Sequence, residues 1–198
     1  MLAIPCVAAF FIIPDLIMRA LFVRGAFTEA DAVAAGRTLA AYAFGLLPFV
    51  LIRSAVATFF ARGDTTTPVM AALIAAAVNI GFKILLMGPL AQVGLALATS
   101  IGAWINLLLV LWFATRAGHS RIDHRLRQSA IKLAAAGLGM GIIVWLCATP
   151  LAKLFSGWAA HDVMTLMGLA AIGGTFYAGI VLTIFGRRWL AAFRGRAR

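Results

Sequence analysis

The sequence predicts an all-α integral membrane protein with six transmembrane helices. Hydrophobic residues make up 64% of the 198-residue chain and charged residues only 12%, and the mean hydropathy is +1.03. A water-soluble domain of this size carries roughly twice that share of charge. The apolar residues also fall into blocks of about twenty residues, which is the length that a helix needs to cross the hydrocarbon layer. The composition therefore excludes a water-soluble fold.

Six apolar segments follow one another, and polar, Gly or Pro residues separate them. They cover residues 1–23, 38–60, 69–88, 93–115, 131–152 and 164–186. The first segment begins at once, without the basic region of a signal peptide, so we expect a truncated first helix and the C-terminal part of a longer protein. Pro48 predicts a kink in the second segment, as membrane helices tolerate.

The last two segments carry rows of small residues at helix-contact spacing. Gly137 and Gly141 form a GxxxG pair in the fifth segment, and Ala170, Gly174 and Ala178 form a similar row in the sixth. Such rows let helix backbones approach closely in lipid. Either these two helices pack through the rows, or the rows reflect the general abundance of small residues in this chain.

The positions of Lys and Arg predict the topology. The net charge of +11 does not form an aromatic-interleaved patch typical of nucleic-acid binding, because the cations lie in the connections between apolar segments. Eleven cations lie in the 59–68 connection, the 116–132 connection and the C-terminal tail, and four lie in the alternate connections (Arg19, Arg24, Arg37 and Lys153). The positive-inside rule then predicts that the first set, with the C-terminus, is cytoplasmic.

The connection between the second and third segments, residues 59–68, is a compact polar turn that we call the hinge. Gly63 frees the backbone, and Asp64 or a following Thr is suited to cap a helix that starts near Pro68. The residues singled out in the hinge are Arg62, Gly63, Asp64, Thr67 and Pro68.

An outward-facing turn precedes the second segment. Its candidate residues are Arg24, Gly25 and Thr28, and Thr28 with Asp31 fits a helix-capping pattern. A plain helix start is the simplest interpretation of this pattern.

Three polar residues inside the segments are candidates for a substrate cavity. Arg53 lies about 10 Å inside the cytoplasmic boundary at the helical rise. Asn79 and Lys83 lie one turn apart on one helical face. Each cation either snorkels to the membrane surface or faces a water-filled cavity. For Thr99 and Asn106, which share a face of the fourth segment, we expect interhelical hydrogen bonds.

The sequence contains no recognisable catalytic constellation, so we expect no enzyme, no cofactor and no metal site. The three histidines, His119, His124 and His161, lie in connections without metal-ligand spacing. Cys6 and Cys147 lie in apolar segments, where cysteine packs as a small hydrophobe. No phosphate-binding loop or nucleophile elbow is present.

Four stretches together resemble the MurJ (MviN) family of lipid II flippases, within the MOP exporter superfamily. They are Leu21–Thr28, Tyr42–Leu46, Phe59–Pro68, and Met87–Leu90 followed by Gly94–Ser100. The resemblance implies a fourteen-helix transporter. Residues 1–115 would supply the last four helices of its second lobe, 116–130 a basic cytoplasmic loop, 131–186 two additional C-terminal helices, and 187–198 a basic cytoplasmic tail.

The resemblance also implies a function in cell-wall synthesis. Family members translocate the undecaprenyl-linked peptidoglycan precursor across the bacterial cytoplasmic membrane by alternating access. A cationic cavity receives the headgroup, and the C-terminal helix pair borders a groove suited to the polyprenyl tail. Arg53 matches a position that is often basic in the family, whereas Lys83 replaces an expected Asn. The implied partners are the lipid-linked precursor, membrane lipids and a missing N-terminal lobe.

Two other interpretations stay open. The first is a MATE-like antiporter or a polysaccharide exporter of the same superfamily. An antiporter is expected to carry an acidic residue inside a membrane span, and Asp15 is the only acidic residue near a span. The other is a non-functional membrane fragment.

Overall fold

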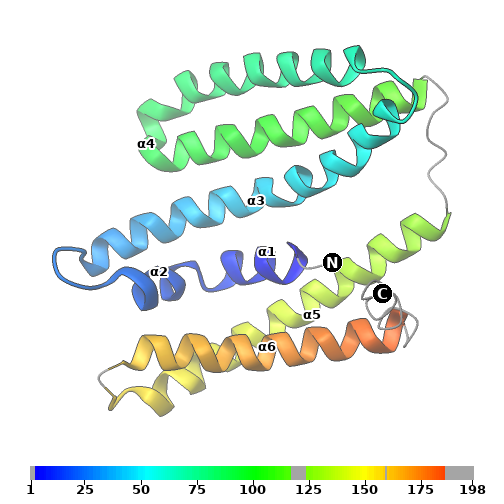
Figure 1. Ribbon diagram of the computed structural model, residues 1–198. Coiled ribbons are helices and arrows are strands. Elements are labelled where there is room, and N and C mark those ends of the chain that lie inside the picture. The colour runs from blue at the N-terminus through cyan, green and yellow to red at the C-terminus, as the bar shows by residue number, and fades with distance from the viewer. Residues whose placement is uncertain (1–2, 117–123, 159, 186–198) are drawn as a thin grey trace, which may run out of the picture. The chain divides into compact units, whose positions relative to one another are not determined.

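The computed structural model describes residues 3–116, 124–158 and 160–185, and all regular structure in these ranges is helical. The helices are α1 (Ala3–Ile12), α2 (Pro14–Phe22), α3 (Glu29–Phe60), α4 (Thr66–Arg116), α5 (His124–Phe155) and α6 (His161–Phe185) (Figure 1). The chain forms two compact units. The first unit comprises residues 1–27 and 124–198, and the second comprises residues 28–123.

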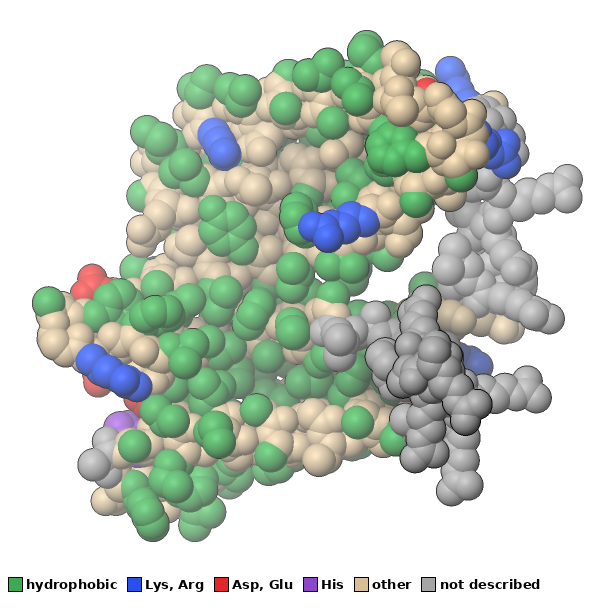
Figure 2. All heavy atoms as spheres, in the orientation of Figure 1, with side chains coloured by type: hydrophobic (Ala, Val, Ile, Leu, Met, Phe, Trp, Pro, Cys, Tyr) green, Lys and Arg blue, Asp and Glu red, His purple; other side chains and the backbone are tan. Residues whose placement is uncertain are grey.

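The all-helical membrane class predicted from composition is confirmed. Helices long and apolar enough to cross a membrane are α3, α4, Gln128–Phe155 of α5 and His161–Thr183 of α6, and the bent pair α1–α2 is a possible fifth span. Hydrophobic side chains predominate over the face shown in Figure 2, where lysine and arginine are sparse. Large apolar side chains exposed on a helix surface are expected where the solvent is lipid.

The second unit contains three helical rods, because α4 turns back on itself at Ala91, and consecutive rods run in opposite directions so that α3 and the last rod are parallel (Figure 1). Ala91 has φ 46° and ψ −126°, outside the helical region, and it follows Pro89. We call residues 66–90 the first arm of α4 and residues 92–116 its second arm. These arms correspond to the predicted segments 69–88 and 93–115.

A very close approach holds α3 against the second arm of α4. The Ser100 hydroxyl donates a 2.7 Å hydrogen bond to the Ala41 carbonyl oxygen. A Cβ on Gly45 would lie 2.8 Å from the Ser100 Cα, so only glycine fits there without a shift of backbone. One turn further along the arm, Trp104 Nε1 donates to the Phe44 carbonyl at 2.9 Å. Small residues and interhelical hydrogen bonds are what hold helices together in lipid, because lipid offers no hydrophobic drive between them.

The interhelical hydrogen bonds predicted for Thr99 and Asn106 are wrong. The Thr99 hydroxyl donates to the Leu95 carbonyl of its own helix at 2.9 Å. Asn106 Oδ1 is buried without a hydrogen-bond partner. The interhelical bonds come instead from Ser100 and Trp104.

The hinge has the capping chemistry that the sequence predicts. At the end of α3, the Asp64 and Gly63 amides donate to the Phe59 and Phe60 carbonyls at 3.1 and 3.0 Å, the Schellman pattern, and Gly63 takes φ 76°. At the start of α4, Asp64 Oδ1 accepts from the Thr66 and Thr67 amides at 3.1 and 3.0 Å. Pro68 follows in the first turn. One aspartate therefore joins the end of one helix to the start of the next.

A small apolar core lies at the hinge end of the second unit. It consists of Phe59, Ala71, Val110 and Ala114, each at most 3% exposed. These residues come from α3 and both arms of α4, so the core fixes the three rods together where the hinge connects them.

The turn before α3 forms the predicted helix cap. The Thr28 amide donates to Asp31 Oδ2 at 2.9 Å, and the Asp31 amide donates to Thr28 Oγ1 at 3.3 Å. This reciprocal pair is a capping box. Gly25 takes φ 61°, and Arg24 and Gly25 are exposed.

In the first unit, α5 packs against α6, α1 packs against α5, and α2 packs against α6. The predicted first segment is not one straight helix, because α1 and α2 meet at an angle of 90°. Ile13 at the junction has φ −128° and ψ 42°, and Pro14 opens α2, where its missing N–H leaves no unpaired donor.

The small-residue rows of α5 and α6 do not pair with each other. A Cβ on Gly141 would meet the Ile12 side chain of α1 at 2.6 Å, and Gly137 faces Ile4 of the same helix. The close contact between α5 and α6 uses Gly173, which faces Val144 and Met140. Gly174 has open space beside it. The GxxxG pair therefore accommodates α1 and not α6.

We predict that Gly45→Ala destabilises the second unit by about 1–3 kcal/mol, because the added methyl group overlaps backbone of the facing helix. Gly81→Ala is the matched control: it lies inside α4 with nothing within 4 Å of the added Cβ. There the higher helix propensity of alanine should leave stability equal or raise it by up to about 1 kcal/mol. Denaturation of the two purified variants in detergent measures the difference, and equal stability would contradict the close approach.

Candidate functional site

The second unit contains a cavity of about 460 Å³ beside the hinge. Its walls come from α3 and from both arms of α4, and its lining residues are Ile52, Arg53, Val56, Phe60, Pro68, Val69, Ala72 and Asn106. The volume lies within the range of small-ligand pockets. All but two of the lining side chains are apolar, so the two polar ones, Arg53 and Asn106, decide which ligand atoms fit. We call this space the Arg53 cavity.

Arg53 supplies a positive charge to this cavity. Its guanidinium lies 5.6 Å from the centre of the Phe49 ring, one helical turn earlier on α3. At that distance the ring face attracts the cation and holds the side chain beside the cavity. Among the described residues no carboxylate forms an ion pair with Arg53. Its charge is therefore available to an anionic ligand.

Asn106 also lines this cavity. Its Oδ1 atom is buried and has no hydrogen-bond partner. Leaving a buried acceptor unpaired costs about 1–3 kcal/mol, so folding alone does not favour asparagine at this position. An anionic ligand in the cavity would pair with Arg53, and a donor on the same ligand would reach Asn106 Oδ1 only after the amide side chain turns toward the cavity.

The other two predicted cavity residues lie elsewhere in the second unit. Asn79, on the first arm, packs against Gly102, where an added Cβ would lie 2.9 Å from the Asn79 Cβ. Its Oδ1 is also buried and unpaired. Lys83 lies one turn further along and is partly exposed. Neither residue lines the Arg53 cavity, so their part in substrate binding stays a prediction.

Of the predicted hinge residues, only Pro68 lines the cavity. Arg62 and Gly63 are exposed in the turn. The Thr67 hydroxyl donates a 2.7 Å hydrogen bond to Asp64 Oδ2. The hinge therefore forms a rigid edge of the cavity. Its predicted role in gating stays a prediction, as does any role of the turn containing Arg24, Gly25 and Thr28.

Asn106 is the cavity residue that the sequence analysis assigned to another role. The available signal was a polar side chain in an otherwise apolar segment, which is costly unless it is paired or used. Its distance of seven residues from Thr99 favoured helix pairing, and only the three-dimensional arrangement brings it beside Arg53.

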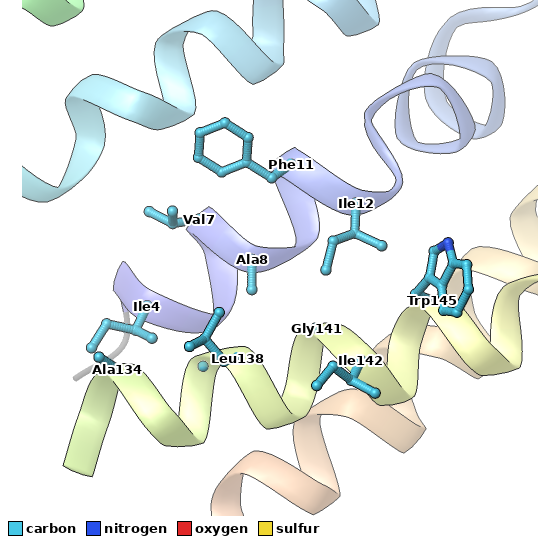
Figure 3. Close-up of a pocket in the computed structure, with 11 residues that line it drawn as sticks. Ile4, Val7, Ala8, Phe11, Ile12, Ala134, Leu138, Gly141, Ile142 and Trp145 are labelled. Atoms are coloured by element: carbon cyan, nitrogen blue, oxygen red, sulfur yellow. The ribbon is translucent and has the colours of Figure 1, made fainter. Parts of the chain in front are cut away.

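The first unit contains an apolar groove of about 680 Å³ between α1 and α5 (Figure 3). Figure 3 shows Ile4 near Ala134 and Leu138 toward one end, and Ile12 near Trp145 toward the other. Aliphatic and aromatic side chains make up almost the whole lining, together with Gly137 and Gly141. The glycines lower the floor of the groove because they place no side chain there. Such a groove suits a hydrocarbon chain.

No metal chemistry is indicated in the part of the chain that the structure describes, where no three His, Cys, Asp or Glu side chains converge. The fold and the two cavities together define a polytopic helical membrane protein. One cavity carries a cation and suits an anionic group, and the other is apolar and suits an alkyl or isoprenoid chain.

Comparison with known proteins identifies the family. The family profile described as "Lipid II flippase MurJ" matches residues 1–171, so the chain belongs to this family. A probable lipid II flippase MurJ of Rhizobium meliloti (strain 1021) is 34% identical over 187 residues, covering 93% of this chain and 35% of the relative. The corresponding protein of Vibrio cholerae serotype O1 is 32% identical over 184 residues, covering 92% and 35%.

A solved structure shares the fold. It is titled "Lipid II flippase MurJ, inward closed conformation", and it superposes with a TM-score of 0.76 at 23% sequence identity. The match covers 96% of this chain and 37% of that chain. The chain thus spans about a third of the length of the relatives that it matches.

We predict that Asn106→Leu raises the stability of the protein by about 1–3 kcal/mol, because it removes a buried acceptor that has no partner. Ser100→Ala on the same arm is the matched control, since Ser100 is buried and its hydrogen bond is made. That substitution should lower stability by about 1 kcal/mol. Thermal denaturation in detergent shows whether each substitution raises or lowers the stability of the protein. A destabilised Asn106→Leu variant would show that the Asn106 side chain has its hydrogen-bond partners within the fold.

Proposed function

We propose that this chain forms the last third of a flippase that translocates the undecaprenyl-linked peptidoglycan precursor, lipid II, across the bacterial cytoplasmic membrane. The observation that carries the proposal is the Arg53 cavity, which pairs a free guanidinium with an unpaired acceptor in mostly apolar walls. Family membership and the names of the relatives support it. The protein would contribute to cell-wall synthesis and cell shape as a transporter that makes and breaks no covalent bond.

Each part of the substrate has a matching feature in the chain. The planar guanidinium of Arg53 presents forked donors that suit two oxygens of a pyrophosphate. The Asn106 carbonyl, once turned toward the cavity, would accept a hydrogen bond from a hydroxyl or amide group, both of which a peptidoglycan headgroup carries. The groove between α1 and α5 takes part of the polyprenyl tail, which stays in apolar surroundings while the headgroup crosses.

The topology supports alternating access. Within the proposal, the hinge and the C-terminus are cytoplasmic, as the distribution of cations predicts. The chain supplies the last four helices of one lobe and two additional helices, and a preceding lobe supplies the remaining cavity cations. Rocking of the lobes would expose the Arg53 cavity to each side of the membrane in turn, as in related transporters.

The Arg53 cavity separates this proposal from an antiporter or an inactive fragment. We predict that the full-length gene rescues growth of a bacterium depleted of its own peptidoglycan flippase. Arg53→Ala should abolish or severely reduce rescue, because a lost charge-assisted contact costs about 1.5–3 kcal/mol, or roughly 10–150-fold in binding. The 198-residue chain alone should fail, because it lacks the preceding lobe.

Arg37→Ala is the matched control, since Arg37 is an exposed cation of the same helix, sixteen residues away, that does not line the cavity. It should rescue like wild type at equal expression. Failure of the well-expressed full-length gene would overturn the proposed function, whereas full rescue by Arg53→Ala would remove the Arg53 cavity as the observation that carries it.

A further inference from the structure

The short helix α2 lies across the direction of the helix before it. α1 is ten residues long, or about 15 Å, which is half of the hydrocarbon thickness. At Ile13 the chain turns by 90° into α2. If α1 runs along the membrane normal, α2 therefore runs along the membrane plane.

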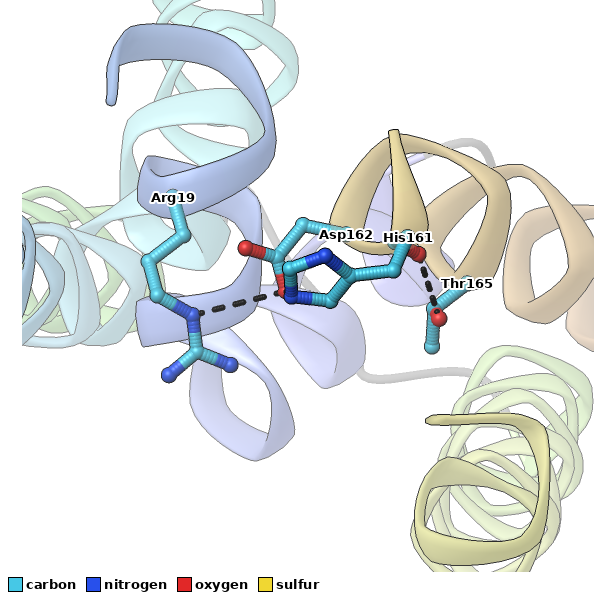
Figure 4. Close-up of polar contacts among 4 residues, drawn as sticks. All are labelled: Arg19, His161, Asp162 and Thr165. Atoms are coloured by element: carbon cyan, nitrogen blue, oxygen red, sulfur yellow. Dashed lines mark hydrogen bonds and ion pairs between the residues drawn. The ribbon is translucent and has the colours of Figure 1, made fainter. Parts of the chain in front are cut away.

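An ion pair fixes the position of α2 relative to the first turn of α6. Arg19 Nε on α2 lies 3.6 Å from Asp162 Oδ1 in the first turn of α6, where His161 Nε2 is also 3.5 Å from the same oxygen (Figure 4). Asp162 directly follows the turn that joins α5 to α6, and α6 then continues as an apolar span. Trp158 in that turn is 60% exposed, as expected for an aromatic residue in a membrane interface. α2 thus lies at the level where the α5–α6 pair leaves the hydrocarbon layer.

The side chains of α2 are arranged for contact with lipid and not with water. Leu16, Ile17 and Ala20 are buried within the unit. The charged residues of the helix, Asp15 and Arg19, line a cavity of about 380 Å³ together with Pro14 and with residues of α5 and α6. At 100° per residue, Met18, Leu21 and Phe22 lie together on one apolar strip of the helix, which Asp15 borders. Leu21 and Phe22 are each 54% exposed.

The charge of Arg19 is used within the unit, because it pairs with Asp162 of α6 although its side chain is 36% exposed. We propose that α2 is an interfacial helix whose apolar strip of Met18, Leu21 and Phe22 binds the headgroup–acyl boundary of the bilayer. Charge counting predicts that this is the outer boundary, because Arg19 and Lys153 both belong to the outward set. Apolar faces of interfacial helices insert about 5–10 Å below the headgroups, which sets the depth of these side chains.

The bilayer is the occupant that the observations favour over a protein partner. The strip lies next to the ion pair at the start of α6, and it is followed two residues after α2 by Arg24, an exposed cation suited to a lipid phosphate. Phe22 also packs against Phe27, with ring centres 6.1 Å apart, so an aromatic pair closes the end of the helix. The helix would fix the depth of the α1–α2 elbow in the membrane.

Depth-dependent fluorescence quenching tests this proposal on the full-length protein in phospholipid vesicles. In a background with Cys6 and Cys147 replaced by Ala, single cysteines at Met18 and Phe22 are labelled with an environment-sensitive fluorophore. Quenchers are carried by lipids either near the headgroup or near the bilayer centre. A cysteine at Leu138 of α5, which is 71% exposed in the middle of a span, is the deep control.

Labels at Met18 and Phe22 should both be quenched more by the shallow lipid than by the deep one, and to the same extent. The Leu138 label should show the opposite order. If α2 instead continued α1 across the membrane, the two α2 labels would differ in depth by about 6 Å and their quenching would be graded. Graded or deep quenching overturns the proposal, and so does absence of quenching at both α2 positions while Leu138 is quenched.

Discussion

The close approach of α3 to the second arm of α4 is the contact on which the second unit depends. Gly45 leaves no room for a side chain above Ser100, and the Ser100 hydroxyl bonds to the Ala41 carbonyl at 2.7 Å. Because lipid provides no hydrophobic drive for association, such close contacts and interhelical hydrogen bonds must supply the attraction. The same two helices form facing walls of the Arg53 cavity, with Arg53 on one and Asn106 on the other.

Some polar groups of the second unit are paired for stability, and others, among them Asn79 Oδ1 outside the cavity, have no partner within the fold. Ser100, Trp104 and Asp64 have hydrogen bonds that join two elements or close a turn. Arg53 and Asn106 lack such partners and line one cavity. A buried acceptor without a partner lowers stability, so its position beside a free cation is best explained by a ligand that satisfies both. The apolar groove of the first unit adds a separate surface for hydrocarbon, and an amphiphilic ligand needs both kinds of surface.

Local features of the fold were predictable from the sequence, but the side of each helix that faces a neighbouring helix was not. Composition and segment length predicted the membrane class, and Thr28, Asp64 and Pro68 predicted their caps because capping depends on neighbouring residues alone. The errors concern which side of a helix faces which neighbour. In a chain that is apolar on nearly all faces, periodicity does not distinguish a lipid-facing side from a packed one. That is why Asn106 was assigned to helix pairing, and why the sequence left open which contact the Gly137–Gly141 row makes. The break at Ile13 was missed although Pro14 and Asp15 mark it, because the apolar segment was predicted as one helix across both residues.

The most direct test of the central claim is whether Arg53 recognises the charge of the lipid substrate. Native mass spectrometry or thermophoresis of the purified full-length protein gives the dissociation constants of lipid II and of neutral undecaprenol. Wild type and the Arg37→Ala variant should prefer lipid II by the same factor. In Arg53→Ala that preference should fall about tenfold or more, since the lost contact is worth about 1.5–3 kcal/mol. An unchanged preference in Arg53→Ala would contradict the account.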